Sequence, residues 1–207
     1  GMINADVTLA LYRLPAGEWI LQTACAQLRT WHAAGWRKLR MAVNLSPRQV
    51  QAPGLVAMVE RALNGMRTDL GRLELEITEG LLIQHAPAIM ETFEALRALN
   101  VRLAVDDFGT GYSSLSYLRR FPIDSLKIDR SFVRDIPHDP DDSAITATII
   151  AMAQNLRLEV VAEGVENAAQ RDFLRSRGCR SMQGYLFSRP MPPDEVTKLL
   201  VDRKPKL

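Results

Sequence analysis

The sequence predicts an α/β fold, a modified parallel (β/α) barrel of the TIM type, from three observations. Helix-like and strand-like segments alternate along the 207 residues. Several strand-like segments are almost continuously apolar, which is typical of parallel strands covered on both faces. Six of these segments end on a charged or amide side chain. Because the active sites of such barrels lie at the carboxyl ends of the strands, the pattern favours an enzyme.

Composition is that of one globular domain of ordinary size. Apolar residues make up 47% of the chain and charged residues 24%, and no apolar run approaches the ~20 residues of a membrane span. The net charge of +2 is too small to argue for a nucleic-acid polymer as partner. Cys25 and Cys179 lack metal-ligand spacing, so we expect buried free thiols in a reducing cytoplasm.

Local signals place the elements in order. Apolar residues at helical spacing from Trp19 to Trp31 predict the first helix, which Gly35 ends. Ser46 and Pro47 begin the next helix as N-cap and first-turn proline. The expected elements are helix 18–34, strand 41–45, a helix from 46 to about 63, strand 73–78, helix 87–99, strand 101–106, helix 113–120, strand 125–128, helix 142–155, strand 159–163, helix 168–177, a short strand near 181 and helix 193–201.

These segments make about six of the eight β/α units of a closed barrel, which typically has ~250 residues. The shortfall lies before the helix that contains Trp19, so we expect an N-terminally incomplete barrel in one domain, residues 14–203. An open sheet edge is expected beside the strand that begins at Met41, and because exposed edges tend to pair, a homodimer is expected. Residues 1–2 resemble a tag remnant and residues 204–207 a frayed tail.

The sharpest local signal is the run Asp106-Asp107-Phe108-Gly109-Thr110-Gly111. Two carboxylates at the end of an apolar strand are costly to bury unless a cation neutralises them. Adjacent strand residues point to opposite faces, so both carboxylates reach one site only if regular strand geometry ends at Asp106. An isolated run of this kind would fit an Asp-rich turn, but the other strand ends favour a metal site.

Glu76 and Asn44 offer further oxygen ligands near the ends of their strands. Glu74 and Glu76 share one face, and their apolar neighbours make a solvated edge strand the weaker interpretation. Glu79 is expected in the loop that follows, where its carboxylate accepts hydrogen bonds and fixes a loop. For Asn44, capping of a turn is nearly as good an interpretation as metal ligation.

The remaining strands end at or near Lys127, Glu163 and Gln183. Lys127 could hold a phosphate oxygen or a nucleophilic water, the alternative being a simple ion pair. Gln183 and Tyr185 could face a base, although Tyr185 is otherwise an ordinary core residue. Carboxylates and one amide, without Cys or His, suit Mg²⁺ or Mn²⁺ rather than Zn²⁺. Two such ions ~4 Å apart support phosphodiester hydrolysis.

Taken together, these residues resemble the EAL family of cyclic di-GMP phosphodiesterases. The likeness extends from about Gly17 to Pro192 in the family's order and spacing, and it rests on segments 43–46, 74–79, 106–115, 127–132, 162–166 and 183–187. The family implies a modified barrel, two Mg²⁺ or Mn²⁺ ions, typically a dimer, and linearisation of cyclic di-GMP to pGpG. By position, the ions would be held by Asn44, Glu76 and Asp106, and by Asp106, Asp107 and Glu163.

The resemblance implies roles for other residues as well. Lys127 would hold water and phosphate, and Gln183 would line the site. Glu79 would brace the loop that contains Gly109 and Thr110.

The chain departs from the family pattern near its start. The Glu-Ala-Leu tripeptide belongs to an early strand in the family, with a metal-binding glutamate and an arginine. Here it occurs as residues 94–96, where Phe93, Leu96 and Leu99 have near-helical spacing, so a structural role is expected. Residues 3–13 are similar to the last helix of a GGDEF domain, the alternative being any amphipathic helix.

Two interpretations from different classes follow. One is a working phosphodiesterase, which the intact remaining positions favour. If the 207 residues are contiguous, however, weak binding of Mg²⁺ or Mn²⁺ and slow turnover are expected. The other is an inactive domain that binds cyclic di-GMP or a protein partner. A different metal-dependent barrel hydrolase is a third and weaker interpretation.

Overall fold

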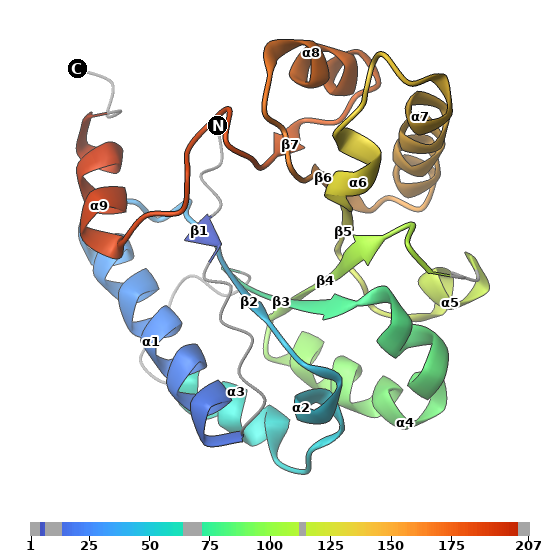
Figure 1. The fold of residues 1–207 in the computed structure, drawn as a ribbon. Coiled ribbons are helices and arrows are strands. Elements are labelled where there is room, and N and C mark those ends of the chain that lie inside the picture. The colour runs from blue at the N-terminus through green and yellow to red at the C-terminus, as the bar shows by residue number, and fades with distance from the viewer. Residues whose placement is uncertain (1–4, 7–13, 64–71, 112–114, 203–207) are drawn as a thin grey trace.

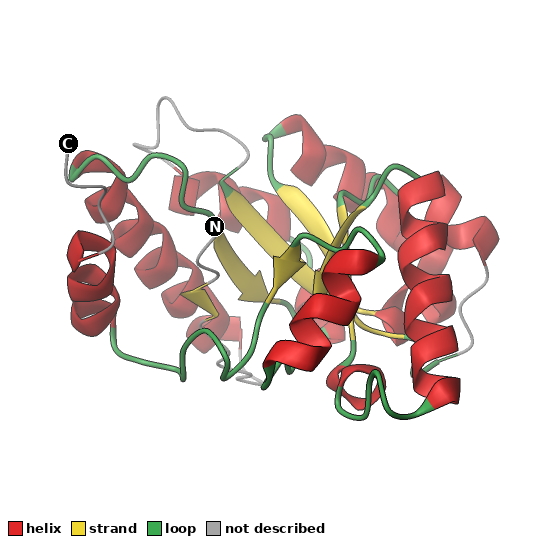
Figure 2. Cartoon of the chain, turned by 90° about the horizontal axis from the view of Figure 1, so that it is seen from above, coloured by secondary structure: helices red, strands yellow, loops and turns green. Residues whose placement is uncertain are grey.

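A computed structural model describes residues 5–6, 14–63, 72–111 and 115–202. Seven parallel strands form one sheet whose spatial order follows the sequence, and the sheet curves into a half-barrel with helices packed outside it (Figures 1 and 2). The strands are β1 (Ala5–Asp6), β2 (Met41–Asn44), β3 (Leu73–Thr78), β4 (Arg102–Phe108), β5 (Ser125–Ile128), β6 (Glu159–Ala162) and β7 (Ser181–Met182). The predicted fold class is confirmed.

The described helices follow the predicted order. They are α1 (Leu14–Ala33), α2 (Pro47–Gln51), α3 (Leu55–Leu63), α4 (Glu79–Ala98), α5 (Leu115–Arg120), α6 (Arg130–Val133), α7 (Pro140–Asn155), α8 (Ala168–Ser176) and α9 (Pro193–Asp202). The predicted cap of α2 is present, because the Ser46 hydroxyl accepts a hydrogen bond from the amide of Gln49. Among the described residues, no helix is long and apolar enough to cross a membrane.

The predicted single helix from 46 to about 63 is wrong. The chain forms α2 and α3 instead, separated by Ala52, Pro53 and Gly54. Gly54 adopts φ +94°, a conformation that ends a helix and that L residues rarely adopt. Proline at position 53 also lacks the amide hydrogen that a continuous helix requires. The short helix α6 was not predicted at all.

The packing of α4 confirms the structural role of the Glu-Ala-Leu tripeptide. Phe93 and Leu96 have no exposed surface, and they lie on the face of α4 that packs against the sheet. Phe93 also contacts Phe121 edge to face, with ring centroids 5.6 Å apart. Residues 94–96 are therefore part of the outer helical layer. Burial of this kind contributes roughly 1.5–3 kcal/mol per large apolar side chain.

Strand β1 corrects two predictions. Ala5 and Asp6 form a strand rather than the predicted helix, and they pair in parallel with Met41 and Ala42 of β2. The expected open edge beside the strand that begins at Met41 is therefore wrong for the first half of β2. Residues 7–13 of the predicted helix lie outside the described residues.

A charged network joins the amino ends of five neighbouring strands. The Arg40 guanidinium, just before β2, donates two hydrogen bonds of 2.8 Å to the Glu159 carboxylate. Arg102 donates to Glu74 at 3.0 Å and to Glu159 at 2.9 Å. Ser125 also donates to Glu74, at 3.0 Å. Two cations balance two carboxylates in this network, which explains how Glu74 is buried.

The Glu159 network predicts acid-sensitive stability. The hydrogen bonds from Arg40 hold the pKa of Glu159 below its usual range. The group therefore stabilises the fold above the unfolded-state pKa of ~4.3, and the contribution is lost as the pH falls through the lower folded-state pKa. Glu159→Gln should reduce the free energy of unfolding by about 1 kcal/mol at neutral pH, since the site is partly exposed. Urea unfolding across a pH series measures this.

The matched control is Glu60→Gln, because Glu60 is exposed on α3 and forms no ion pair among the described residues. It should leave stability unchanged at every pH. A Glu159→Gln deficit that persists undiminished at acidic pH would contradict the assignment.

Candidate metal and phosphodiester site

The parallel sheet brings the predicted acids to one edge. Glu76 lies on β3, Asp106 and Asp107 on β4, and Lys127 on β5, while Glu163 follows β6 directly. Since the described strands are all parallel, these positions share the carboxyl edge of the sheet. The strand ends therefore converge as the sequence predicts.

The Lys127 ammonium lies at the centre of this edge. Its Nζ atom is 2.7 Å from Glu163 Oε1, 2.8 Å from Glu76 Oε2 and 3.0 Å from Asp106 Oδ1. Lys127 and Glu76 are each only 1% exposed, so these are buried ion pairs. One cation from β5 thus connects three carboxylates from β3, β4 and the β6 end.

The carboxylates fix the charge state of Lys127. Burial by itself disfavours the ammonium, but attraction to Glu76, Glu163 and Asp106 outweighs burial and raises the pKa of Lys127. The side chain therefore stays protonated across the physiological range. It can donate to an anionic oxygen but cannot accept a proton there.

A bulge allows both aspartates to reach one site. The register of β4 against β5 shifts between Val105 and Phe108, and Asp107 adopts φ +53°. This break in strand alternation is the departure from regular geometry that the sequence predicts. One oxygen each from Asp106, Asp107 and Glu163 all lie within 4.8 Å of one another, the spacing of a metal-ligand set.

Asp129 was missed as a member of this cluster. It follows β5 and caps α6, where its carboxylate accepts a hydrogen bond from the Ser131 amide at 2.9 Å. Although partial burial opposes ionisation, the bonds from Ser131 hold the pKa of Asp129 below its usual range. Burial and the nearby charges of Asp106 and Asp129 raise the pKa of Asp107. The signal in the sequence was one more acid after an apolar strand.

Glu79 holds the loop after β4, as predicted, but from an unexpected place. It is the first residue of α4 rather than part of a loop, and it is buried. Its Oε2 atom accepts hydrogen bonds from the amides of Gly109 at 2.9 Å and Gly111 at 3.3 Å. Thr110 donates within the same turn, to the Asp107 carbonyl at 2.9 Å.

The remaining predicted residues lie around the carboxyl edge. Asn44 is the register partner of Glu76 across β2 and β3. The backbone N–H of Gln183 donates to the Ala162 carbonyl at 2.8 Å, which places Gln183 beside the end of β6. Tyr185 is 53% exposed rather than a core residue.

The donor set fits divalent metal ions that prefer oxygen. Among the described residues, Glu76, Asp106, Asp107 and Glu163 contribute four carboxylates and Lys127 one cation. Four carboxylates around one ammonium leave negative charge in excess of what Lys127 balances, and burial and then acidic neighbours raise the pKa of Asp107. A bound Mg²⁺ or Mn²⁺ would relieve this excess.

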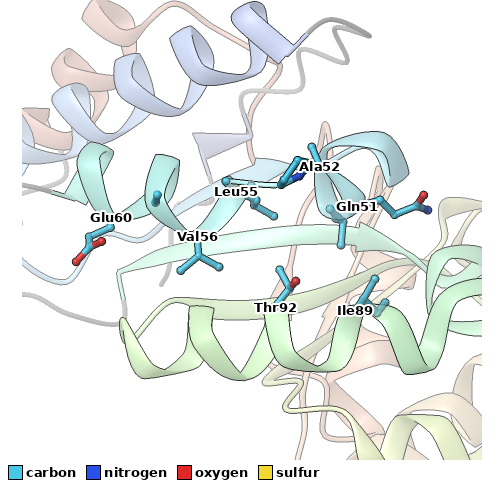
Figure 3. Close-up of a pocket in the computed structure, with 11 residues that line it drawn as sticks. Gln51, Ala52, Leu55, Val56, Glu60, Ile89 and Thr92 are labelled. Atoms are coloured by element: carbon cyan, nitrogen blue, oxygen red, sulfur yellow. The ribbon is translucent and has the colours of Figure 1, made fainter.

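A cavity of about 630 Å³ lies elsewhere, between the α2–α3 segment and α4 (Figure 3). Its lining is largely apolar, with Val56 on one side and Ile89 and Thr92 of α4 on the other. None of the clustered acids lines this cavity. The acidic edge of the sheet is therefore the better candidate for chemistry.

Comparison with known proteins identifies the family. A family model described as "EAL domain" matches residues 3–190. The chain belongs to the EAL domain family. The match begins inside the segment in which the sequence suggested the tail of another domain. The assignment of residues 3–13 to an upstream GGDEF domain stays a prediction.

Relatives and solved structures agree with this membership. NbdA of Pseudomonas aeruginosa, named a cyclic di-GMP phosphodiesterase, is 50% identical over 175 residues, or 84% of this chain and 22% of NbdA. MucR of the same organism, named a bifunctional diguanylate cyclase/cyclic di-GMP phosphodiesterase, is 46% identical over 87% of this chain and 26% of MucR. This EAL chain thus spans about a quarter of the length of these relatives.

Two solved EAL structures superpose closely on this chain. "PaMucR Phosphodiesterase, c-di-GMP complex" gives a TM-score of 0.85 at 45% identity, covering 88% of this chain and 74% of that one. The EAL domain of Mycobacterium smegmatis DcpA gives 0.85 at 40% identity, covering 91% and 86%. This EAL chain therefore shares the fold of these EAL structures over the part that it covers.

Replacement of Lys127 tests the charge balance of the edge. Lys127→Met should lower the free energy of unfolding by about 3–5 kcal/mol without divalent cations, because three carboxylates lose their partner. Added Mg²⁺ should restore part of this loss, since a cation can occupy the same carboxylates. Urea unfolding with chelator and with Mg²⁺ measures both effects. Lys198→Met, at an exposed position on α9, is the control and should change little.

Two different outcomes would contradict the prediction for Lys127→Met. Equal losses in Lys127→Met and Lys198→Met would contradict the ion pairs. An identical response of Lys127→Met and the parent chain to Mg²⁺ would contradict competition between ammonium and metal.

Two glycines with nearly equal backbone angles test the loop after β4. Gly109 has φ +103° and a Cβ there would lie 2.7 Å from Phe132, whereas Gly35 has φ +100° with nothing within 4 Å. Gly35→Ala should cost only about 1–2 kcal/mol for the backbone angle. Gly109→Ala should cost about 1–3 kcal/mol more through overpacking. Equal midpoints in urea would show that Phe132 does not restrict the loop.

Proposed function

We propose that this EAL chain hydrolyses cyclic di-GMP to linear pGpG, in the cytoplasm and as a homodimer. The observation that carries the proposal is the carboxyl edge of the sheet, where Glu76, Asp106 and Glu163 converge on Lys127 at 2.7–3.0 Å. Relatives at 50% and 46% identity are named for this activity. Two buried free thiols support the reducing compartment.

The acids of the edge would hold two ions of the Mg²⁺ or Mn²⁺ class. Asn44, Glu76 and Asp106 would hold one ion. Asp106, Asp107 and Glu163 would hold the other, so that Asp106 would be a ligand shared by both. Bound there, such a pair of ions supplies charge stabilisation to an in-line displacement at phosphorus.

Other residues of the chain position the substrate. Once bound ions engage Asp106 and Glu163, Lys127, held in its charged form, would donate its freed N–H groups to a non-bridging phosphate oxygen and to the attacking water. Glu79 keeps the segment that contains Gly109 and Thr110 in place beside Asp107. Gln183 and Tyr185 follow the end of β7, where an amide and an exposed ring would suit a guanine base.

Turnover of cyclic di-GMP with Mg²⁺ or Mn²⁺, followed as pGpG by chromatography, tests the proposal. Asp106→Asn should lower the rate more than about a hundredfold, since the loss of a metal ligand exceeds that of the groups that support one. Asp172→Asn is the matched control, because Asp172 is exposed on α8 and pairs with Arg171 instead. Its rate should equal that of the parent chain.

Three results would contradict the proposal in different ways. Parent-like turnover by Asp106→Asn would remove the bridging role. Tight binding of cyclic di-GMP without turnover would favour a receptor. Comparable turnover of an unrelated phosphodiester would favour a broader hydrolase.

A further inference from the structure

The two edges of the sheet differ in charge, a feature that the net charge conceals. The six residues before each of β2, β4, β5, β6 and β7 contain ten cations and one acid, Asp124. The six residues after each of β2, β3, β5, β6 and β7 contain three cations and four acids. The ten cations are Arg37, Lys38, Arg40, Arg97, Arg119, Arg120, Arg157, Arg175, Arg177 and Arg180.

The cations of the amino edge are available to a partner. All except Arg40 are exposed, and these nine form no ion pair with any described residue. Asp124 does not neutralise them, because its carboxylate accepts from the Leu103 amide at 2.9 Å and faces Arg102 at 3.9 Å.

Helix capping explains only some of these charges. Arg97, Arg120 and Arg175 lie in the last turns of α4, α5 and α8, where cations stabilise the helix dipole. Arg37 and Arg180 lie four residues beyond the ends of α1 and α8. The dipole effect falls off within the last turn, so local helix stability does not require these cations.

We propose that the amino edge of the sheet docks on an anionic lipid bilayer. The cations precede five of the six strands from β2 to β7, so they are spread along the amino edge of the sheet. An acidic peptide or a nucleic-acid duplex would contact only one strip of this edge. A flat anionic surface reaches all of them together. Each nearby Lys or Arg raises partitioning onto such a surface about fivefold.

Docking of this kind is electrostatic. The large exposed apolar residues of the described chain are Trp19, Ile145, Tyr185, Phe187 and Val201, and none lies in the basic segments. Nothing in those segments inserts into the bilayer interior, so attachment is reversible and weakens with salt. The acidic carboxyl edge is repelled by the same surface and points away from the lipid. This inference does not depend on the proposed hydrolysis.

Co-sedimentation with vesicles tests the docking surface. The full chain should sediment with vesicles of phosphatidylcholine and phosphatidylglycerol, and not with phosphatidylcholine alone. Raised salt should release it. The variant R37Q/K38Q/R180Q should bind about a hundredfold more weakly, because three cations are lost. All three positions are exposed, and circular dichroism confirms that the variant is folded.

The control R48Q/R130Q/R134Q removes the same net charge from the carboxyl edge and should keep binding within about fivefold of the parent. An equal loss in both variants would show that net charge alone drives binding. Equal sedimentation with neutral vesicles, salt-insensitive binding, or capture by duplex DNA without any binding to anionic vesicles would each overturn the proposal.

Discussion

The contact of Lys127 with three carboxylates constrains the rest of the sheet. The ammonium meets Glu76, Asp106 and Glu163 at 2.7–3.0 Å, and these residues come from three different strands or strand ends. A slip of any strand by one residue would turn its charged side chain to the opposite face and leave a buried charge unpaired. Register and charge balance therefore select the same arrangement.

The half-barrel holds two charged layers with different consequences. At the amino ends, Arg40 and Arg102 balance Glu74 and Glu159, so each charge of this partly buried network has a partner and the network serves stability. At the carboxyl ends, a single ammonium faces at least four carboxylates, and burial together with acidic neighbours raises the pKa of Asp107. The excess of negative charge at the carboxyl ends is the condition for the proposed binding of divalent cations. The same strands thus carry a balanced set of charges at their amino ends and an excess of acids at their carboxyl ends.

The sequence predicted those features of the fold and the site that depend on side-chain alternation and on the positions of strand ends. Glu74 and Glu76 share a buried face because they are two residues apart on a strand, and the break at Asp106 follows from two adjacent acids needing one site. Glu79 was placed in a loop because the helix was predicted to begin only near residue 87, whereas α4 begins at Glu79 itself. Pro53 and Gly54 already indicate the break between α2 and α3 in the sequence. The pairing of β1 depends on a contact with Met41, far along the chain.

The separation of acids and cations on opposite edges of the sheet also connects the candidate site to the proposed docking on an anionic surface. Acids gather where strands end, as the proposed metal and phosphate chemistry requires, whereas the basic segments before the strands exceed what helix ends require. Opposed edges make the molecule a strong dipole despite a net charge of only +2. Near an anionic surface, such a dipole turns its acidic edge outward. The parallel strands that build the site would also set this orientation, and they would leave the site open to the proposed anionic substrate.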